Sequence, residues 1–123
     1  MKYAVLCYHA ENVVCAWSKE HDEAVMEKLG AVQERWAKNG KLGPVARLMP
    51  TTAATTVRKD HEPPLVLDGP FAETKEQLLG FFVVDCASLE EALDFTRELA
   101  EANPGGAYEV RPIGYFVDWS LSS

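Results

Sequence analysis

Three absences limit what this sequence can encode. Its three cysteines, Cys7, Cys15 and Cys86, make an odd count without a C-x-x-C pair, which argues against a disulfide framework and a thiolate zinc site. No apolar run approaches the roughly 18 residues that a membrane-spanning helix requires. No small-residue cleavage site follows the short apolar run after Met1, so nothing indicates a signal peptide. We therefore expect a protein of the reduced cytoplasm.

Basic residues and known ligand-binding motifs are also scarce. The chain has 12 Lys and Arg against 19 Asp and Glu, which gives a net charge of −7. Binding to nucleic acid or to an anionic membrane requires clustered cations, so we expect neither partner. The three histidines lack metal-binding spacing, and neither G-x-G-x-x-G nor the P-loop motif occurs. The sequence therefore predicts no metal site and no cofactor.

What the sequence does contain is a set of strand and helix patterns for one domain, spanning residues 1–123. Apolar and β-branched runs predict strands at residues 3–8, 41–49, 54–58, 65–67, 79–86 and 108–113. Pro44 cannot donate a ladder hydrogen bond, so it places the start of the second strand at a sheet edge or bulge. Residues 9–17 are expected to form a loop with a helical turn.

The first predicted helix covers residues 18–39. Ser18 is its N-cap, Gly40 ends it, and its apolar stripe repeats at helical spacing through Val25, Leu29, Val32 and Trp36. Gly30 inside this helix costs roughly 1 kcal/mol relative to alanine. Close packing against a neighbouring element would explain that glycine.

The second predicted helix begins after Ser88 and ends at Asn103. Ser88 and Glu91 fit a capping box, in which the hydroxyl accepts from the Glu91 amide and the carboxylate reaches back. Its inner stripe is expected to consist of Leu89, Ala92, Leu93, Thr96, Leu99 and Ala100.

The resulting order is β-α-β, a hairpin, and β-α-β, an α+β arrangement. Two helices cannot cover both faces of the sheet, so we expect them together on one face. The other face then stays open. The apolar strands and the aromatic tail, with Tyr115, Phe116 and Trp119, favour burial of that face in a homodimer.

Four stretches of the chain resemble a known family: KYAVLCY at 2–8, ATTVR at 54–58, DGPFAETKEQLLGF at 68–81 and EVRPI at 109–113. They are similar to the YCII-related family, specifically to its DGPF subgroup of small bacterial proteins. The resemblance implies a ferredoxin-like β-α-β-β-α-β fold with a hairpin insertion, paired through the open sheet faces into a dimeric α+β barrel. It also implies a link to alternative sigma factors, with which DGPF-type proteins are associated.

Better-studied relatives carry a histidine near the first helix and an aspartate in a D-P step, a pair proposed as an active-site dyad. One branch of them dechlorinates ring-cleavage products. Here the corresponding positions fall near Leu29 and at Asn103-Pro104. The resemblance therefore does not transfer that activity to this chain.

The densest group of ionisable residues lies between Val66 and Gly80. Asp68, in the D-G-P turn, either caps nearby amides or holds a ligand and acts as a general base. Glu73, Lys75 and Glu76 form either a solvated face or a polar network that binds an anionic group.

Further candidates lie on the strands. Arg111 and Glu109 share one face of the last strand, and Arg111 is expected to point to the open sheet face. There it either pairs with a carboxylate or anchors a carboxylate ligand. Arg47 and Arg58 are weaker candidates of the same kind. His9, which follows the first strand, is a candidate for facing a cavity.

These residues lead to two functional hypotheses. The first is a homodimer that binds a small polar or anionic molecule, or that serves as an accessory or regulatory protein linked to sigma factors. Its ligand-binding candidates are Arg111, Glu109, Glu73, Lys75 and Arg47. The alternative is an enzyme of hydrolase or lyase type, in which Asp68 or His9 performs acid–base chemistry on a small carboxylate held by Arg111.

Overall fold

The structure is a computed structural model and describes residues 1–119. Within these residues, three α-helices and six strands follow one another, together with a short 3₁₀ helix, η1. In order they are β1 (Lys2–His9), α1 (Glu11–Val14), α2 (Lys19–Lys38), β2 (Leu42–Arg47), η1 (Thr51–Ala53), β3 (Thr55–Arg58), β4 (Leu65–Asp68), β5 (Gln77–Asp85), α3 (Leu89–Ala102) and β6 (Ala107–Pro112).

Four strands form an antiparallel sheet in the order β2-β5-β1-β6, and β3 and β4 form a separate hairpin. This is the predicted α+β arrangement, consistent with a ferredoxin-like fold. β1 lies in the centre and β2 at an edge, where the missing amide of Pro44 is tolerated. The pairing of β2 with β5 shifts register between Leu42 and Val45, so the predicted bulge also occurs at this proline.

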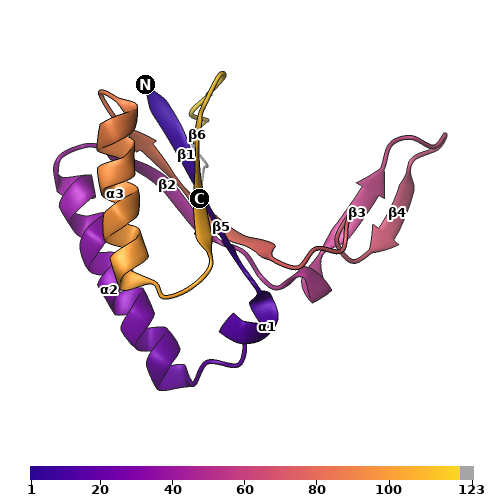
Figure 1. Cartoon of the computed structure of the whole chain (residues 1–123). Helices are drawn as coiled ribbons and strands as arrows, with labels where there is room; N and C mark the ends of the chain where they lie inside the picture. Colours follow the sequence, from indigo (N-terminus) through magenta and orange to yellow (C-terminus); the bar gives the residue numbers. More distant parts are fainter. Residues whose placement is uncertain (120–123) are drawn as a thin grey trace.

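Helices α2 and α3 lie side by side against one face of the sheet (Figure 1). Both begin at the serine that the sequence indicates. The Ser18 hydroxyl accepts from the His21 amide at 3.0 Å, and the Ser88 hydroxyl accepts from the Glu91 amide at 3.2 Å. The Glu91 carboxylate reaches back to the amide of Ala87, one residue before the position that a capping box requires.

The core is formed where alternate residues of β1 and β5 meet the inner stripes of both helices. The stripe of α2 is the predicted one, and Val25, Leu29 and Val32 are buried. The predicted stripe of α3 is partly wrong, because Phe95 is fully buried while Leu89 is 48% exposed. Burial of Ala92, Phe95 and Leu99 rotates the stripe away from Leu89, which stands in the first, solvent-facing turn.

The expected close packing at Gly30 is also absent. Gly30 is exposed, and a β-carbon built on it would meet nothing within 4 Å. The packing interpretation of this glycine is therefore wrong, and its helix-propensity cost stands without a compensating contact.

The β3–β4 hairpin, called the arm from here on, stands away from the sheet (Figure 1). Its base is held by Glu11 of α1. The Glu11 carboxylate accepts from the amide of Thr51 at 3.0 Å and also from its hydroxyl, while the Glu11 amide donates to Gln77 at 2.9 Å. Apolar side chains remain exposed on the arm, including Val57 and Val66.

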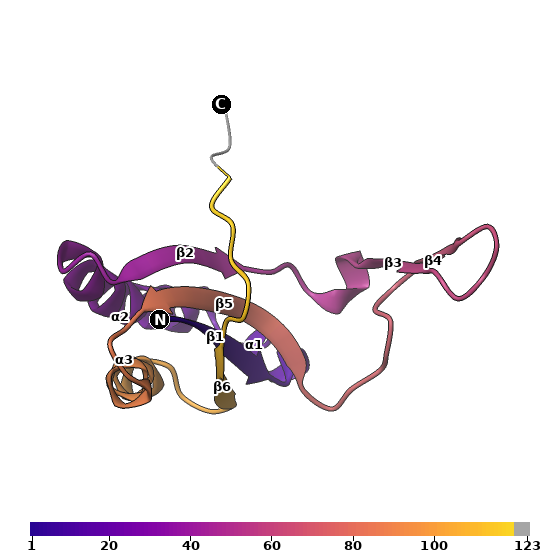
Figure 2. The same cartoon turned by 90° about the horizontal axis from the view of Figure 1, so that it is seen from above.

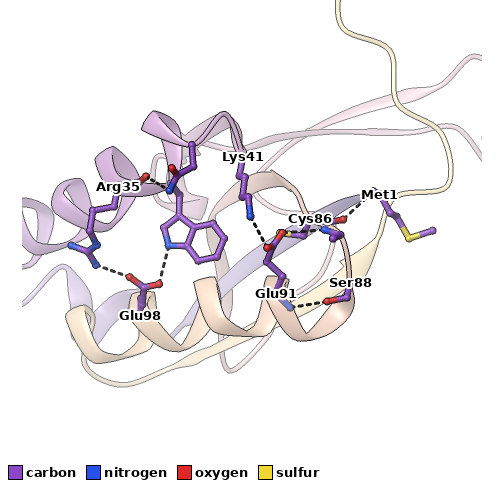
Figure 3. A network of polar contacts seen from close by, with 10 residues as sticks. Met1, Arg35, Lys41, Cys86, Ser88, Glu91 and Glu98 are labelled. Carbon is purple, nitrogen blue, oxygen red and sulfur yellow. Dashed lines mark hydrogen bonds and ion pairs between the residues drawn. The ribbon is translucent and has the colours of Figure 1, made fainter.

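A polar network joins α2 and α3 to the end of β5 (Figure 3). Lys41 donates to Glu91 at 2.6 Å, and Arg35 and the Trp36 indole donate to Glu98 at 2.6 and 2.9 Å. Lys41 lowers the pKa of Glu91. Burial raises the pKa of the Cys86 thiol to about 11, which leaves it protonated and unreactive at neutral pH. This network therefore contributes to packing rather than to chemistry.

Within residues 1–119, no helix is long and apolar enough to cross a membrane.

Candidate functional site

A cavity of about 90 Å³ lies between the sheet and α2, and its floor follows from the strand register. The pairings place four residues in one row across the sheet, with their side chains toward the helices. From β2 to β6 this row is Arg47, Gly80, Cys7 and Tyr108. The neighbouring row contains Phe82, whose ring fills the core. Gly80 has no side chain, so the cavity lies over it.

The close approach of β2 to β5 requires a glycine at position 80. A β-carbon at Gly80 would lie within 3.0 Å of the Ala46 carbonyl oxygen on β2. The same residue therefore permits the pairing of β2 with β5 and leaves space above the sheet.

The cavity is small and mostly apolar. Its walls include Trp17 and, from α2, Val25, Met26 and Leu29. Pockets for drug-sized ligands are roughly 300–1,000 Å³. The site therefore accepts a small molecule, or one end of a larger one.

A neutral polar group lines the β6 side of the cavity. The Asn103 side-chain amide donates to the Tyr108 hydroxyl at 2.9 Å and lies 3.9 Å from the Cys7 sulfur. Burial raises the pKa of both Cys7 and Tyr108. Both groups therefore remain protonated at neutral pH and offer hydrogen bonds rather than charge.

An ion pair lines the β2 side. The Arg47 guanidinium donates to both carboxylate oxygens of Asp22, at 2.9 and 3.3 Å. Arg47 holds the pKa of the Asp22 carboxyl below its ordinary value, and Asp22 in turn raises the pKa of Arg47. The two groups are therefore both ionised at neutral pH and neutralise each other.

His9, at the end of β1, is another lining residue. Its ring lies edge-on to Trp17, with 6.2 Å between the ring centroids. The Nδ1 atom is buried and has no hydrogen-bond partner among residues 1–119. Leaving such an atom unpaired costs about 1–3 kcal/mol, so a ligand group or an ordered water is its expected partner.

Two of the sequence-derived candidates, His9 and Arg47, line this cavity, and the structure places the others elsewhere. Asp68 is exposed at the end of β4 on the arm. Gly69, which follows Asp68 in the turn, has a φ of 99°, a conformation that favours glycine. Glu73 and Lys75 are exposed in the segment between the arm and β5.

The remaining candidates pair with neighbours outside the cavity. Arg111 donates to Glu109 at 2.7 Å on the open sheet face, as the alternation of β6 predicts. Arg58 lies 3.5 Å from Asp60 on the arm. The structure thus does not bring Asp68, Arg111 and His9 together.

Sequence reasoning did not select Cys7, Tyr108 or Asp22 for this site. The alternation of β1 was the available signal for Cys7, which shares a face with Tyr3, Val5 and His9. No local signal pairs Asp22 with Arg47, which lies 25 residues further along the chain. Among the described residues, no group of three or more histidine, cysteine, aspartate or glutamate side chains could hold a metal ion.

The fold and the cavity define a small α+β protein with a partly polar chamber between its sheet and helices. The chain belongs to the YCII-related family, whose domain model matches residues 1–117. It is similar to an uncharacterised protein of Rhizobium meliloti (strain 1021), with 61% identity over 124 aligned residues that cover 100% of both chains.

The resemblance places the histidine and aspartate of better-studied relatives near Leu29 and at Asn103, and both of these residues line the cavity. Neither side chain ionises. The positions at which the resemblance expects that pair therefore belong to the cavity lining.

Proposed function

We propose that this protein binds a small molecule with an apolar body and one polar or anionic group in the cavity over Gly80. The buried, unpaired Nδ1 of His9 carries this proposal. A ligand group hydrogen-bonded to Nδ1 removes the cost of that unpaired atom, while the apolar walls take up the ligand body. Arg47 offers an ion-pair partner to an anionic ligand group, and the Asn103–Tyr108 pair offers hydrogen bonds to a neutral one.

The test is a thermal-shift screen of short-chain carboxylates, their amides and small ring-cleavage products. A ligand present at about 100 times its Kd stabilises the folded state by about 2.7 kcal/mol. His9→Gln is expected to weaken binding about fivefold to tenfold, because the glutamine amide reaches the Nε2 position and leaves Nδ1 unreplaced.

His61→Gln is the matched control, since His61 is exposed at the tip of the arm. It is expected to leave affinity unchanged. The proposal fails if no compound gives a saturable shift with the wild-type protein, or if both histidine variants lose affinity equally. Arg111→Gln shows whether the ligand binds in the cavity or on the open sheet face. Only a ligand on the open sheet face is expected to bind this variant more weakly.

The same nitrogen supports a second candidate, an enzyme in which His9 transfers a proton to or from a bound small carboxylate. An imidazole nitrogen without a hydrogen-bond partner is available to exchange a proton with a bound ligand. The same compounds, incubated with the protein and followed by NMR, separate the two functions. Conversion that is lost in His9→Gln supports the enzyme, and unchanged ligand spectra support binding alone.

We also propose that the protein is a homodimer joined through the open sheet face. No helix among the described residues covers that face, and the segment after β6 runs away from the sheet (Figure 2). That segment leaves Tyr115 and Trp119 more than 80% exposed. Exposed aromatic side chains of this kind are typical of protein interfaces.

Light scattering at micromolar concentration is expected to give twice the 13.6 kDa mass of the chain. Trp119→Ser is expected to shift the equilibrium toward the monomer, and Val66→Ser on the arm serves as the control. A monomeric wild-type mass at that concentration would contradict this architecture. The accessory role linked to sigma factors is a proposal that rests on the family resemblance alone.

A further inference from the structure

We infer that Asp22 competes with the ligand for Arg47, and that the cavity therefore selects a small monocarboxylate that replaces Asp22 on the guanidinium. This inference rests on the proposed binding function and names its ligand class. It starts from one fact about the lining: Arg47 is the only lysine or arginine among the described residues around the cavity.

The Asp22 carboxylate already has the geometry of a bound carboxylate ligand. Its two oxygens accept from the two terminal nitrogens of Arg47, at 2.9 and 3.3 Å. This fork-to-fork arrangement is the one in which arginine recognises carboxylates. A ligand carboxylate can therefore take the same position, oxygen for oxygen, and displaces the Asp22 carboxylate, which keeps its own negative charge nearby.

Releasing Asp22 from this pair has a small cost. The Arg47 side chain is 51% exposed and that of Asp22 is 33% exposed, so the pair lies where the cavity meets solvent. Partly exposed ion pairs contribute modestly to stability, even in a bidentate geometry such as this one. Asp22 also stands in the first turn of α2, where the helix dipole favours a negative charge without help from Arg47.

The rest of the lining supports one negative charge and no more. Cys7 and Tyr108 stay protonated because burial raises their pKa values, and the surrounding walls are apolar. A dicarboxylate would place its second charge beside these walls without a cation to pair with it. The structure thus fits a short acid with one carboxylate, whose other end reaches toward His9 or the Asn103–Tyr108 pair.

The experiment measures the affinities of butyrate and of its neutral analogue butyramide for the full chain by calorimetry. Asp22→Asn removes the competing charge and is expected to tighten butyrate binding about threefold to tenfold, while butyramide binding stays the same. Arg47→Gln is expected to weaken butyrate binding at least tenfold, since it removes the guanidinium.

Two matched variants control for charge. Glu34→Gln removes one negative charge from the same helix, where Glu34 pairs with Lys38 in solvent, and Arg35→Gln removes one arginine from it. Both are expected to leave butyrate affinity unchanged. Circular dichroism melts of every variant show that each one is folded at the temperature of the measurement.

The outcomes separate this inference from the proposed function. If butyrate and butyramide bind equally and Asp22→Asn changes neither, a ligand site exists but the competition is refuted. If Asp22→Asn weakens butyrate binding, Asp22 contacts the ligand directly and the inference is overturned. If neither probe nor any compound of the wider screen binds the wild-type protein, the proposed function itself fails.

Discussion

Replacing Phe95 with alanine is expected to lower the free energy of unfolding by about 3–5 kcal/mol. Phe95 is fully buried at the centre of the core, where its ring meets the Trp36 and Phe82 rings edge-on, with 5.2 and 5.6 Å between centroids. Alanine removes these contacts and leaves a cavity that the two helices and the sheet cannot close. Urea denaturation followed by tryptophan fluorescence and circular dichroism measures the change.

Leu89→Ala is the matched control for this prediction. Leu89 lies on the same helix and is 48% exposed, so its truncation is expected to cost less than about 1 kcal/mol. The sequence pattern alone assigned Leu89 to the inner stripe. If both variants lost the same free energy of unfolding, Leu89 would belong to the buried stripe of α3 after all. That result would contradict the burial described above.

Replacing Gly80 with alanine is expected to destabilise the protein by about 1–3 kcal/mol and to weaken ligand binding in the cavity. The new β-carbon would lie within 3.0 Å of the Ala46 carbonyl oxygen, which is rigid backbone. β2 must then shift away from β5. Arg47, which pairs with Gly80 in the sheet, moves with it and loses its alignment with Asp22.

Gly30→Ala is the same substitution as Gly80→Ala at another glycine, and it is expected to have the opposite effect on stability. Gly30 is exposed in the middle of α2 and has open space around it, so alanine is expected to stabilise the protein by about 0.5–1 kcal/mol. Thermal and urea unfolding of both variants tests the pair. If Gly80→Ala proved as harmless as Gly30→Ala, the tight approach of β2 to β5 could not be the reason for Gly80.

Much of the fold could be predicted because its signals are local. Ser18 and Ser88 cap the two long helices as expected, and Gly40, which follows α2, has the left-handed backbone with a φ of 69°. Pro44 marks an edge strand because its missing amide cannot serve a central one. These features depend on one residue and its immediate neighbours, so the sequence reveals them directly.

The candidate site was harder to predict, because its members come from strands, helices and a loop that meet only in the tertiary structure. The ionisable residues between Val66 and Gly80 attract attention by their density, yet Asp68, Glu73 and Lys75 are exposed on the arm and the segment that follows it. Charge density along a chain is typical of solvated segments, whereas a site requires convergence of distant residues. His9 and Arg47 converge on the cavity although 38 positions separate them in the sequence.

The sequence by itself determined where the two long helices begin and end, that β2 starts at an edge or a bulge, and which residues of α2 enter the core. Capping, proline chemistry and helical periodicity act over a few residues, which is why these features need no tertiary information. Only the tertiary structure decided that Arg47, Gly80, Cys7 and Tyr108 form one row beneath α2. That row depends on strand register, and the irregularity between Leu42 and Val45 decides which side chain of β2 lies opposite Gly80.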